Sequence, residues 1–308
     1  PLVTLSTMAG RGPKSSAADE IEQKEFDGVV YRIGDAMLGG QRRSLKDLFL
    51  PVTVGSLLAA SAFSPATRTI IGKGLGAVMV GVSGYFVLHC NIPKLRDAVL
   101  AKVMPGTFQD MDKKMKRVKK ELLKSLEGRV LDVGAGTGSY IKYSRSLPVA
   151  EYVALEPYAY LIPSLKKNAE KSKAEALANK ESHPEVTVLN QTLEMLPSDQ
   201  NGTFDCVIFG NVMCEIKDCP AALAHVRRLL KPGGKLYFIE HVLDDQNPFR
   251  SALQHMINPL WRSFSDGCNC NRRSLDSIRT QFPNVMCFTL GTAGIAHLRP
   301  FIVGIAKA

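Results

Sequence analysis

Short apolar runs alternate with helical patterns along the C-terminal part of this 308-residue chain. Each run is rich in β-branched or aromatic residues and has the length of a buried strand rather than of a helix. The expected strands are residues 130–133, 152–155, 186–189, 204–209 and 235–241. Helical spacing of apolar residues between them, as in the segment that Pro220 opens, predicts connecting helices. This alternation predicts an α/β fold built on a doubly wound, mostly parallel sheet.

A basic amphipathic pattern precedes the first expected strand, at residues 110–126. Its apolar stripe recurs at helical spacing and consists of Met111, Met115, Val118, Leu122 and Leu126, while Lys or Arg occupies seven of the other positions. The pattern predicts a helix with two open interpretations. The stripe packs against the sheet and leaves a solvated basic face, or the helix lies on a membrane surface. In either case we expect this helix to help cover the binding site.

Two uncharged apolar runs, Leu48–Phe63 and Leu75–Cys90, lie upstream of that helix. Both are shorter than the ~20 residues that span a bilayer comfortably. They can pair as a membrane hairpin, form a monotopic anchor, or be buried helices of an extension. We expect residues 28–109 to form a helical, membrane-associating extension, residues 1–27 a mobile tail, and residues 110–308 the main domain.

The charge of the chain favours an anionic partner, since its net charge is +10 and its sequence pI is near 9.3. Arg42, Arg43 and Lys46 precede the two apolar runs, and the lysine-rich helix follows them. Both flanks would then lie on the same side of a bilayer, the side on which Lys and Arg accumulate. The chain has no aromatic and basic stacking platform and no recognition module outside the main domain, so we expect no nucleic-acid partner. Membrane lipid is the expected partner.

The seven cysteines show no paired framework, which favours a reducing compartment. Cys268 and Cys270 are separated by one residue, and no second cluster has the spacing of a metal site. We therefore expect free thiols and no metal.

The most informative segment is the exit of the first expected strand, Asp132-Val133-Gly134-Ala135-Gly136-Thr137-Gly138. Glycines at every second position allow the backbone to approach a ligand closely. A dinucleotide-binding turn has the spacing GxGxxG, but Ser139 follows Gly138 here and the third glycine comes one residue early. A carboxylate before the loop suits a ligand that carries an ammonium and a sulfonium rather than a pyrophosphate. The loop therefore favours S-adenosylmethionine.

Further polar residues follow the other expected strands. Glu156 ends the second strand, near the ~20-residue offset at which an acid meets ribose hydroxyls. Leu193 and Glu194 lie in a turn after the third strand that would border the adenine, and Asn211 follows the fourth. Ligands of open α/β sheets bind outside the carboxyl ends of the strands. These residues, with Asp132, Gly134, Gly136 and Gly138, form the predicted cofactor site.

Several motifs together resemble the class I S-adenosylmethionine-dependent methyltransferases of the type 11 kind, which have a Rossmann-like fold. They are Asp132–Gly138, Glu156, Leu193–Pro197, Phe204–Asp205 and Lys231–Gly234. A second set is similar to the membrane-attached, methyltransferase-like thiol methyltransferases, namely Phe238–Val242, Asn258–Trp261, Asp266–Cys268 and Arg299–Gly304. The chain differs from this family at Glu156 and Tyr158, where Asp and Asn are more usual, and at Leu275, where Trp is common.

The resemblance implies methyl transfer to a small apolar acceptor, expected to be a thiol, at a membrane surface of an organelle (mitochondrion or plastid) or of the endoplasmic reticulum. A thiol attacks as its thiolate, so the expected catalytic residues are His241, Asp266 and Glu240, any of which can take the proton. For His241 the alternative is a strand-end histidine held by local hydrogen bonds. Two other functions stay open: methylation of a quinone or other lipid at carbon or oxygen, and an accessory scaffold role in an organellar membrane complex.

Overall fold

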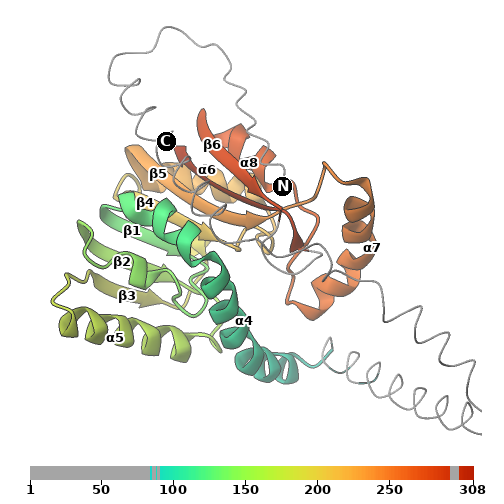
Figure 1. Ribbon diagram of the computed structural model, residues 1–308, viewed down its shortest axis with the longest axis horizontal. Helices are drawn as coiled ribbons and strands as arrows, with labels where there is room; N and C mark the ends of the chain where they lie inside the picture. The colour runs from blue at the N-terminus through green and yellow to red at the C-terminus, as the bar shows by residue number, and fades with distance from the viewer. Residues whose placement is uncertain (1–83, 85–87, 89–90, 292–297) are drawn as a thin grey trace, which may run out of the picture.

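A single seven-stranded sheet forms the centre of the computed structural model, which describes residues 84, 88, 91–291 and 298–308. The strand order is β3-β2-β1-β4-β5-β7-β6 (Figure 1). The bounds are Gly128–Val133 for β1, Val149–Leu155 for β2, Glu185–Leu189 for β3, Phe204–Gly210 for β4, Leu230–His241 for β5, Asn284–Leu290 for β6 and Phe301–Lys307 for β7. The first five strands are mutually parallel, and β7 runs antiparallel between β5 and β6. The doubly wound, mostly parallel sheet predicted from the sequence is confirmed.

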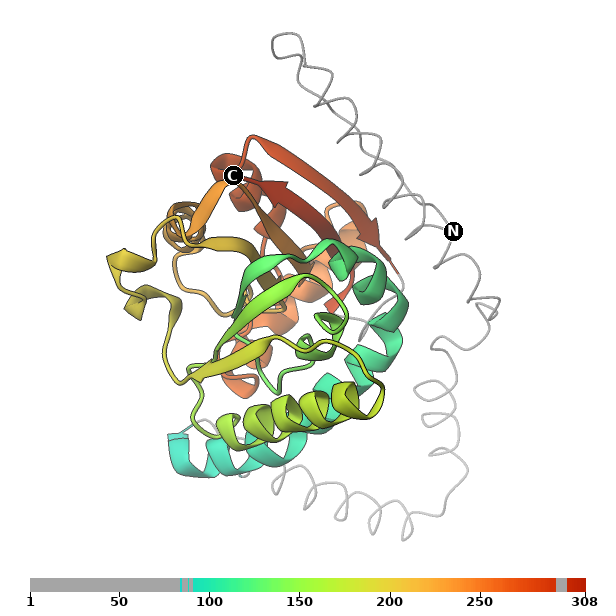
Figure 2. The same cartoon turned by 90° about the vertical axis from the view of Figure 1, so that its left-hand side faces the viewer.

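Two helical layers cover the sheet because the side chains of each strand alternate between its faces. In β1, Val130 joins one apolar cluster and Leu131 the other. The first cluster includes apolar residues of α4 (Pro93–Leu122) and α5 (Ile162–Ala178), which lie on the same side of the sheet in both views (Figures 1 and 2). The second includes residues of α6 (Cys219–Leu229) and α8 (Ser274–Gln281). The core therefore has two halves, one on each face.

The basic helix expected at residues 110–126 is the C-terminal half of the longer α4, followed by a 3-10 turn at Leu123–Ser125. Its stripe residues Met115, Val118 and Leu122 are buried in the core cluster of that face. Of the two interpretations of the pattern, the structure shows packing against the sheet. Lipid contact by this segment is thereby limited to its exposed basic face.

The predicted tail at residues 1–27 and the apolar run at 48–63 lie outside the described residues, as does the run at 75–90 except for Gly84 and Leu88. Their membrane association stays a prediction. Among the residues described, no helix combines the length and the apolar character that crossing a membrane requires.

One helix lies apart from both layers. It is α7 (Pro248–Phe264), at the end of the molecule that the N-terminal half of α4 also occupies (Figure 1). Asn247 caps it by accepting a hydrogen bond from the backbone N–H of Arg250 at 3.0 Å, and Pro248 fits the first turn, where no N–H is needed. Large apolar side chains of α7 are exposed.

The packing of β7 predicts a steric requirement at Gly304. A β-carbon at this position would lie 2.1 Å from the carbonyl oxygen of Met286 and 2.6 Å from the Phe238 ring. We expect Gly304→Ala to lower the free energy of unfolding by roughly 1–3 kcal/mol, since neither neighbour can move freely. Urea denaturation followed by circular dichroism measures it. Gly106→Ala, where nothing lies within 4 Å, is the matched control and should be neutral or stabilising. Equal stability of the two variants would contradict the argument.

Candidate functional site

The glycine loop leaves β1 at the carboxyl edge of the sheet, as predicted. Gly134, Gly136 and Gly138 have positive φ values of 65°, 56° and 77°, which side chains rarely tolerate. A β-carbon at Gly134 would lie 2.5 Å from Val212, and one at Gly138 would lie 2.7 Å from Leu165. Two of the glycines are thus required by the protein's own packing as well as by the turn. The third, Gly136, faces Phe108 of α4.

Asp132 lies immediately before this loop and is 1% exposed. The Tyr152 hydroxyl donates a hydrogen bond to its Oδ2 at 2.7 Å. Burial raises the pKa of Asp132 to about 7, against the opposing effects of the Tyr152 hydrogen bond and the Lys119 charge. A buried carboxylate with so high a pKa gains stability from a bound cation. The site therefore fits the ammonium of S-adenosylmethionine.

Glu156, at the end of β2, is buried and joins its neighbouring loops. Its Oε2 accepts the backbone N–H of Gly136 at 2.7 Å, and its Oε1 accepts that of Tyr158 at 2.8 Å. Burial raises its pKa, and these two hydrogen bonds oppose the rise. Each carboxylate oxygen can accept further hydrogen bonds, so two ribose hydroxyls can be bound there. The glycine loop and this acid are thus joined directly by a hydrogen bond.

The remaining predicted cofactor residues divide into two groups. Asn211, just after β4, has a φ of 59°, and its side-chain oxygen is buried without a hydrogen-bond partner in the described part of the chain. Such an orphaned acceptor fits a ligand that donates a hydrogen bond. Leu193 is buried in the second core half, whereas Glu194 is exposed and its charge acts on His225 of α6. The structure records no contact between Glu194 and the other site residues.

Helix α4 is held over the glycine loop by Lys119, whose ammonium is paired within the helix and also reaches the segment that follows the loop. Lys119 Nζ lies 3.1 Å from Asp112 Oδ1 and 3.3 Å from Ser139 Oγ, which follows the loop. The same ammonium is 4.0 Å from the centroid of the Tyr140 ring. At the other end of α4, Arg96 pairs with Asp266 at 3.0 Å. The cover expected from residues 110–126 is therefore a longer helix that is tied down on both sides of the site.

The three expected catalytic residues have different surroundings. Glu240 Oε1 accepts the backbone N–H groups of Val212 (3.0 Å) and Met213 (3.2 Å), which orders the loop after β4. Burial raises the Glu240 pKa to about 7 despite these hydrogen bonds. Asp266 is the partner of Arg96, so its carboxylate serves the tie to α4. The side chain of His241 differs from both acids, because its ring nitrogen lies beside a sulfur atom.

That sulfur belongs to a cluster that sequence reasoning missed, Cys214, His241 and Cys268, all buried. Cys268 Sγ lies 3.3 Å from His241 Nε2, and the Trp261 indole N–H donates to the same sulfur at 3.2 Å. The hydrogen bond from Cys214 and then that from His241 hold the Cys268 pKa well below its usual range, although burial acts the other way. The residues come from three distant segments, so no local spacing pointed to them.

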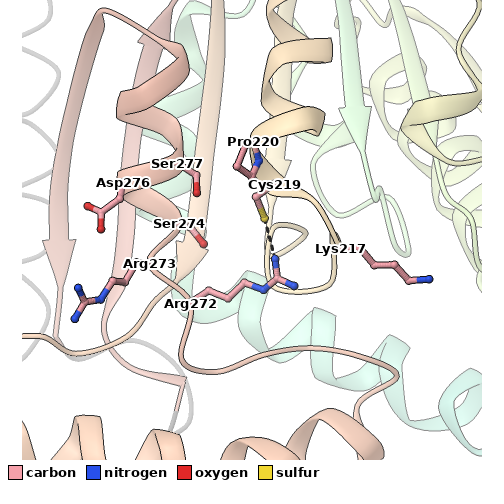
Figure 3. Close-up of a pocket in the computed structure, with 8 residues that line it drawn as sticks. All are labelled: Lys217, Cys219, Pro220, Arg272, Arg273, Ser274, Asp276 and Ser277. Atoms are coloured by element: carbon pink, nitrogen blue, oxygen red, sulfur yellow. Dashed lines mark hydrogen bonds between the residues drawn. The ribbon is translucent and has the colours of Figure 1, made fainter.

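A separate pocket of about 370 Å³ lies between the N-terminal ends of α6 and α8 (Figure 3). Lys217, Arg272 and Arg273 give it a basic character, and Arg272 donates hydrogen bonds to the Ile216 carbonyl and to Cys219 Sγ. None of the predicted site residues lines this pocket. The candidate site is thus the sheet edge around Asp132 and Glu156.

Comparisons with known proteins show the family of the chain. A family model described as a methyltransferase domain matches residues 108–285. The thiol S-methyltransferase TMT1B of Rattus norvegicus is 29% identical over 184 residues, which cover 56% of this chain and 70% of that protein. The thiol S-methyltransferase TMT1A of Homo sapiens is 32% identical over 145 residues, 47% of this chain and 55% of its own length. A ubiquinone biosynthesis O-methyltransferase of Xanthomonas oryzae pv. oryzae is 36% identical over 109 residues, 35% of this chain and 41% of that protein.

The ionisation of Asp132 predicts how cofactor binding depends on pH. Its carboxylate binds a cation only when ionised, and burial places its pKa at about 7. Affinity for S-adenosylmethionine should rise as the pH increases through that value and fall by up to about tenfold per unit below it. Calorimetric titration from acid to slightly alkaline pH measures this.

Asp132→Asn is the control for that titration, because the ligand's own ammonium titrates identically with both proteins. The variant should bind more weakly above neutral pH and lose the rise. Superimposable pH profiles for the two proteins would remove Asp132 from the site.

Proposed function

Since the chain belongs to the methyltransferase domain family, we propose that it methylates the sulfur of a small apolar thiol at a membrane surface. The methyl donor is S-adenosylmethionine, as the sequence predicts. The observation that carries the choice of acceptor is the similarity to the two thiol S-methyltransferases. The human relative is matched over just 55% of its length, so its acceptor is a proposal for this chain.

The residues at the carboxyl edge of the sheet divide the work of binding. Asp132 pairs with the donor's ammonium, Glu156 accepts its ribose hydroxyls, and Asn211 Oδ1 accepts a further hydrogen bond. When bound, S-adenosylmethionine supplies an electrophilic methyl group on a positively charged sulfur. Phe108 and the rest of α4 exclude water above the loop, which matters because a dry site favours the neutralisation of opposite charges.

Activation of the acceptor is assigned to residues at the end of β5 and beyond it. A thiol attacks as its thiolate, and a positioned base makes the thiolate available at neutral pH. Of the three candidates we assign the role of base to His241, because its ring nitrogen lies beside a sulfur atom, Cys268 Sγ. Catalysis otherwise comes from placement, since holding two reactants in line replaces a costly encounter in solution.

A second candidate function is methylation of a quinone or other lipid at oxygen or carbon. The observation that favours it is the 36% identity to a ubiquinone biosynthesis O-methyltransferase. That match covers just 35% of the chain, less than the matches to the thiol enzymes. A scaffold role in an organellar membrane complex is the third candidate function. It would be recognised by cofactor binding without methyl transfer.

The membrane part of the proposal is supported by α7. Phe249, Leu253, Met256 and Leu260 recur along one side of this helix and are exposed, Phe249 by 90% and Met256 by 71%. An exposed apolar stripe on one helix is typical of a surface that rests in the headgroup region of a bilayer. An acceptor dissolved in lipid would then reach the site directly. The proposed location is a membrane of a reducing compartment.

The acceptor is tested by supplying the chain with methyl-labelled S-adenosylmethionine and either a small alkyl thiol or a quinol. We expect kcat/KM for the thiol to exceed that for the quinol by roughly a hundredfold, in line with the similarity to the thiol S-methyltransferases. Asp132→Ala should abolish both donor binding and transfer. Preference for the quinol would support the second function instead. Donor binding with no transfer to either acceptor would favour the scaffold.

Membrane contact is tested with the protein's single tryptophan, Trp261, which lies in α7. Vesicles of brominated phospholipid should quench its fluorescence if α7 sits about 5–10 Å into the interface. The double variant Phe249→Ser and Met256→Ser should lose most of this quenching. Leu177→Ser, which changes a residue 81% exposed on α5, is the matched control and should keep it. Vesicle-bound protein with unquenched Trp261 would contradict contact through α7.

A further inference from the structure

We propose that Cys214, His241 and Cys268 bind a zinc ion, and that the fourth position of this ion takes the sulfur of the acceptor. The metal site stands on the geometry and chemistry of the three residues. Its acceptor half rests on the proposed function. The sequence had predicted no metal, because Cys268 and Cys270 alone lack the spacing of a zinc site.

The positions of the three ligand atoms suit one ion. The two sulfur atoms and one ring nitrogen of His241 all lie within 4.8 Å of one another, and all three residues are buried. The distance from Cys268 Sγ to His241 Nε2 is 3.3 Å. In a tetrahedral site with Zn–S about 2.3 Å and Zn–N about 2.0 Å, ligand atoms lie roughly 3.5–3.8 Å apart. Small side-chain shifts are enough to bring the three onto a single zinc ion.

The donor set selects the metal. Two thiolates and an imidazole are ligands for zinc rather than for magnesium or calcium, which prefer oxygen. Two thiolate charges cancel the charge of the ion, so the occupied site is neutral and tolerates burial. The ligands bind in their deprotonated forms, so metal binding depends on pH. Three protein ligands with an open fourth position are the arrangement of catalytic zinc sites, whereas structural sites use four.

Buried polar atoms beside the cluster lack hydrogen-bond partners. Asn211 Oδ1, Glu240 Oε2 and His241 Nδ1 are buried without a hydrogen-bond partner among the described residues. Unsatisfied buried polar atoms are rare and mark a region that is completed by something else.

The place of the cluster in the fold links it to the acceptor. Cys214 follows β4, His241 ends β5, and Cys268 follows α7, so the ion would lie along the same sheet edge as Asp132 and Glu156. The Trp261 indole N–H, 3.2 Å from Cys268 Sγ, gives this ligand the outer hydrogen bond that metal-bound groups usually have. A thiol that coordinates zinc loses its proton to solvent. His241 then acts as a ligand, and coordination replaces it as the base.

The test begins with metal content. Full-length protein, purified with its thiols reduced, should contain one zinc per chain by plasma mass spectrometry. Replacement by Co²⁺ should give the intense visible bands of a tetrahedral site and a thiolate charge-transfer band. Cys214→Ser and Cys268→Ser should each lose most of the zinc and this spectrum. Cys270→Ser removes a buried cysteine outside the cluster and should keep both.

The outcomes separate the two halves of the proposal. Wild-type protein with no zinc and no cobalt spectrum overturns the site. Cobalt bands that do not shift on addition of an alkyl thiol overturn the open position. Calorimetric binding of S-adenosylmethionine confirms that each variant is folded.

The failure of the proposed function gives a different pattern. Protein that binds cobalt in the cluster but methylates only quinols leaves the metal site standing and removes the thiol acceptor. Protein that methylates thiols at an undiminished rate after zinc is removed by chelation leaves the proposed function standing and overturns the binding of the acceptor to zinc.

Discussion

The reversal of the chain at the end of β1 is the constraint on which the site depends. Three glycines with positive φ turn the backbone back over the sheet, and the turn directs the Gly136 N–H at Glu156 of the adjacent strand. The same turn brings Ser139 to the buried ammonium of Lys119, which holds α4 in place. One backbone conformation thus sets the acid that binds ribose, the cover above it and the position of Asp132.

Much of the sheet could be predicted from the sequence, because a buried strand is a short, continuous apolar run that can be recognised without knowing the rest of the fold. Apolar runs of strand length predicted β1 to β5. Because these strands were expected to be parallel, their carboxyl ends predicted the sheet edge where Asp132, Glu156 and Asn211 lie. The glycine spacing gave the turn, and the carboxylate before it gave the cationic cofactor. The reason for the glycines was partly different from the expected one, since Val212 and Leu165 fill the space beside two of them.

The acceptor side was not predictable in the same way. Cys214, His241 and Cys268 are far apart in sequence and meet because two strand ends and the loop after α7 converge. Glu240 and Asp266 are acids of the right type, but their hydrogen bonds and ion pairs depend on loops whose course the sequence does not reveal. The basic segment before β1 was ambiguous for another reason: an apolar stripe looks identical whether it meets a sheet or a bilayer.

The arrangement of β7 has a consequence for synthesis of the protein. This strand is the latest of the sheet in chain order, yet it lies between β5 and β6 and is the strand with which β6 pairs. Until β7 emerges from the ribosome, β5 keeps an unpaired edge and β6 has no partner in the described sheet. Unpaired strand edges are prone to mispairing with other chains. Any pause in translation after β5 would therefore prolong a state that is open to mispairing, and the sheet is completed only when this late segment is inserted.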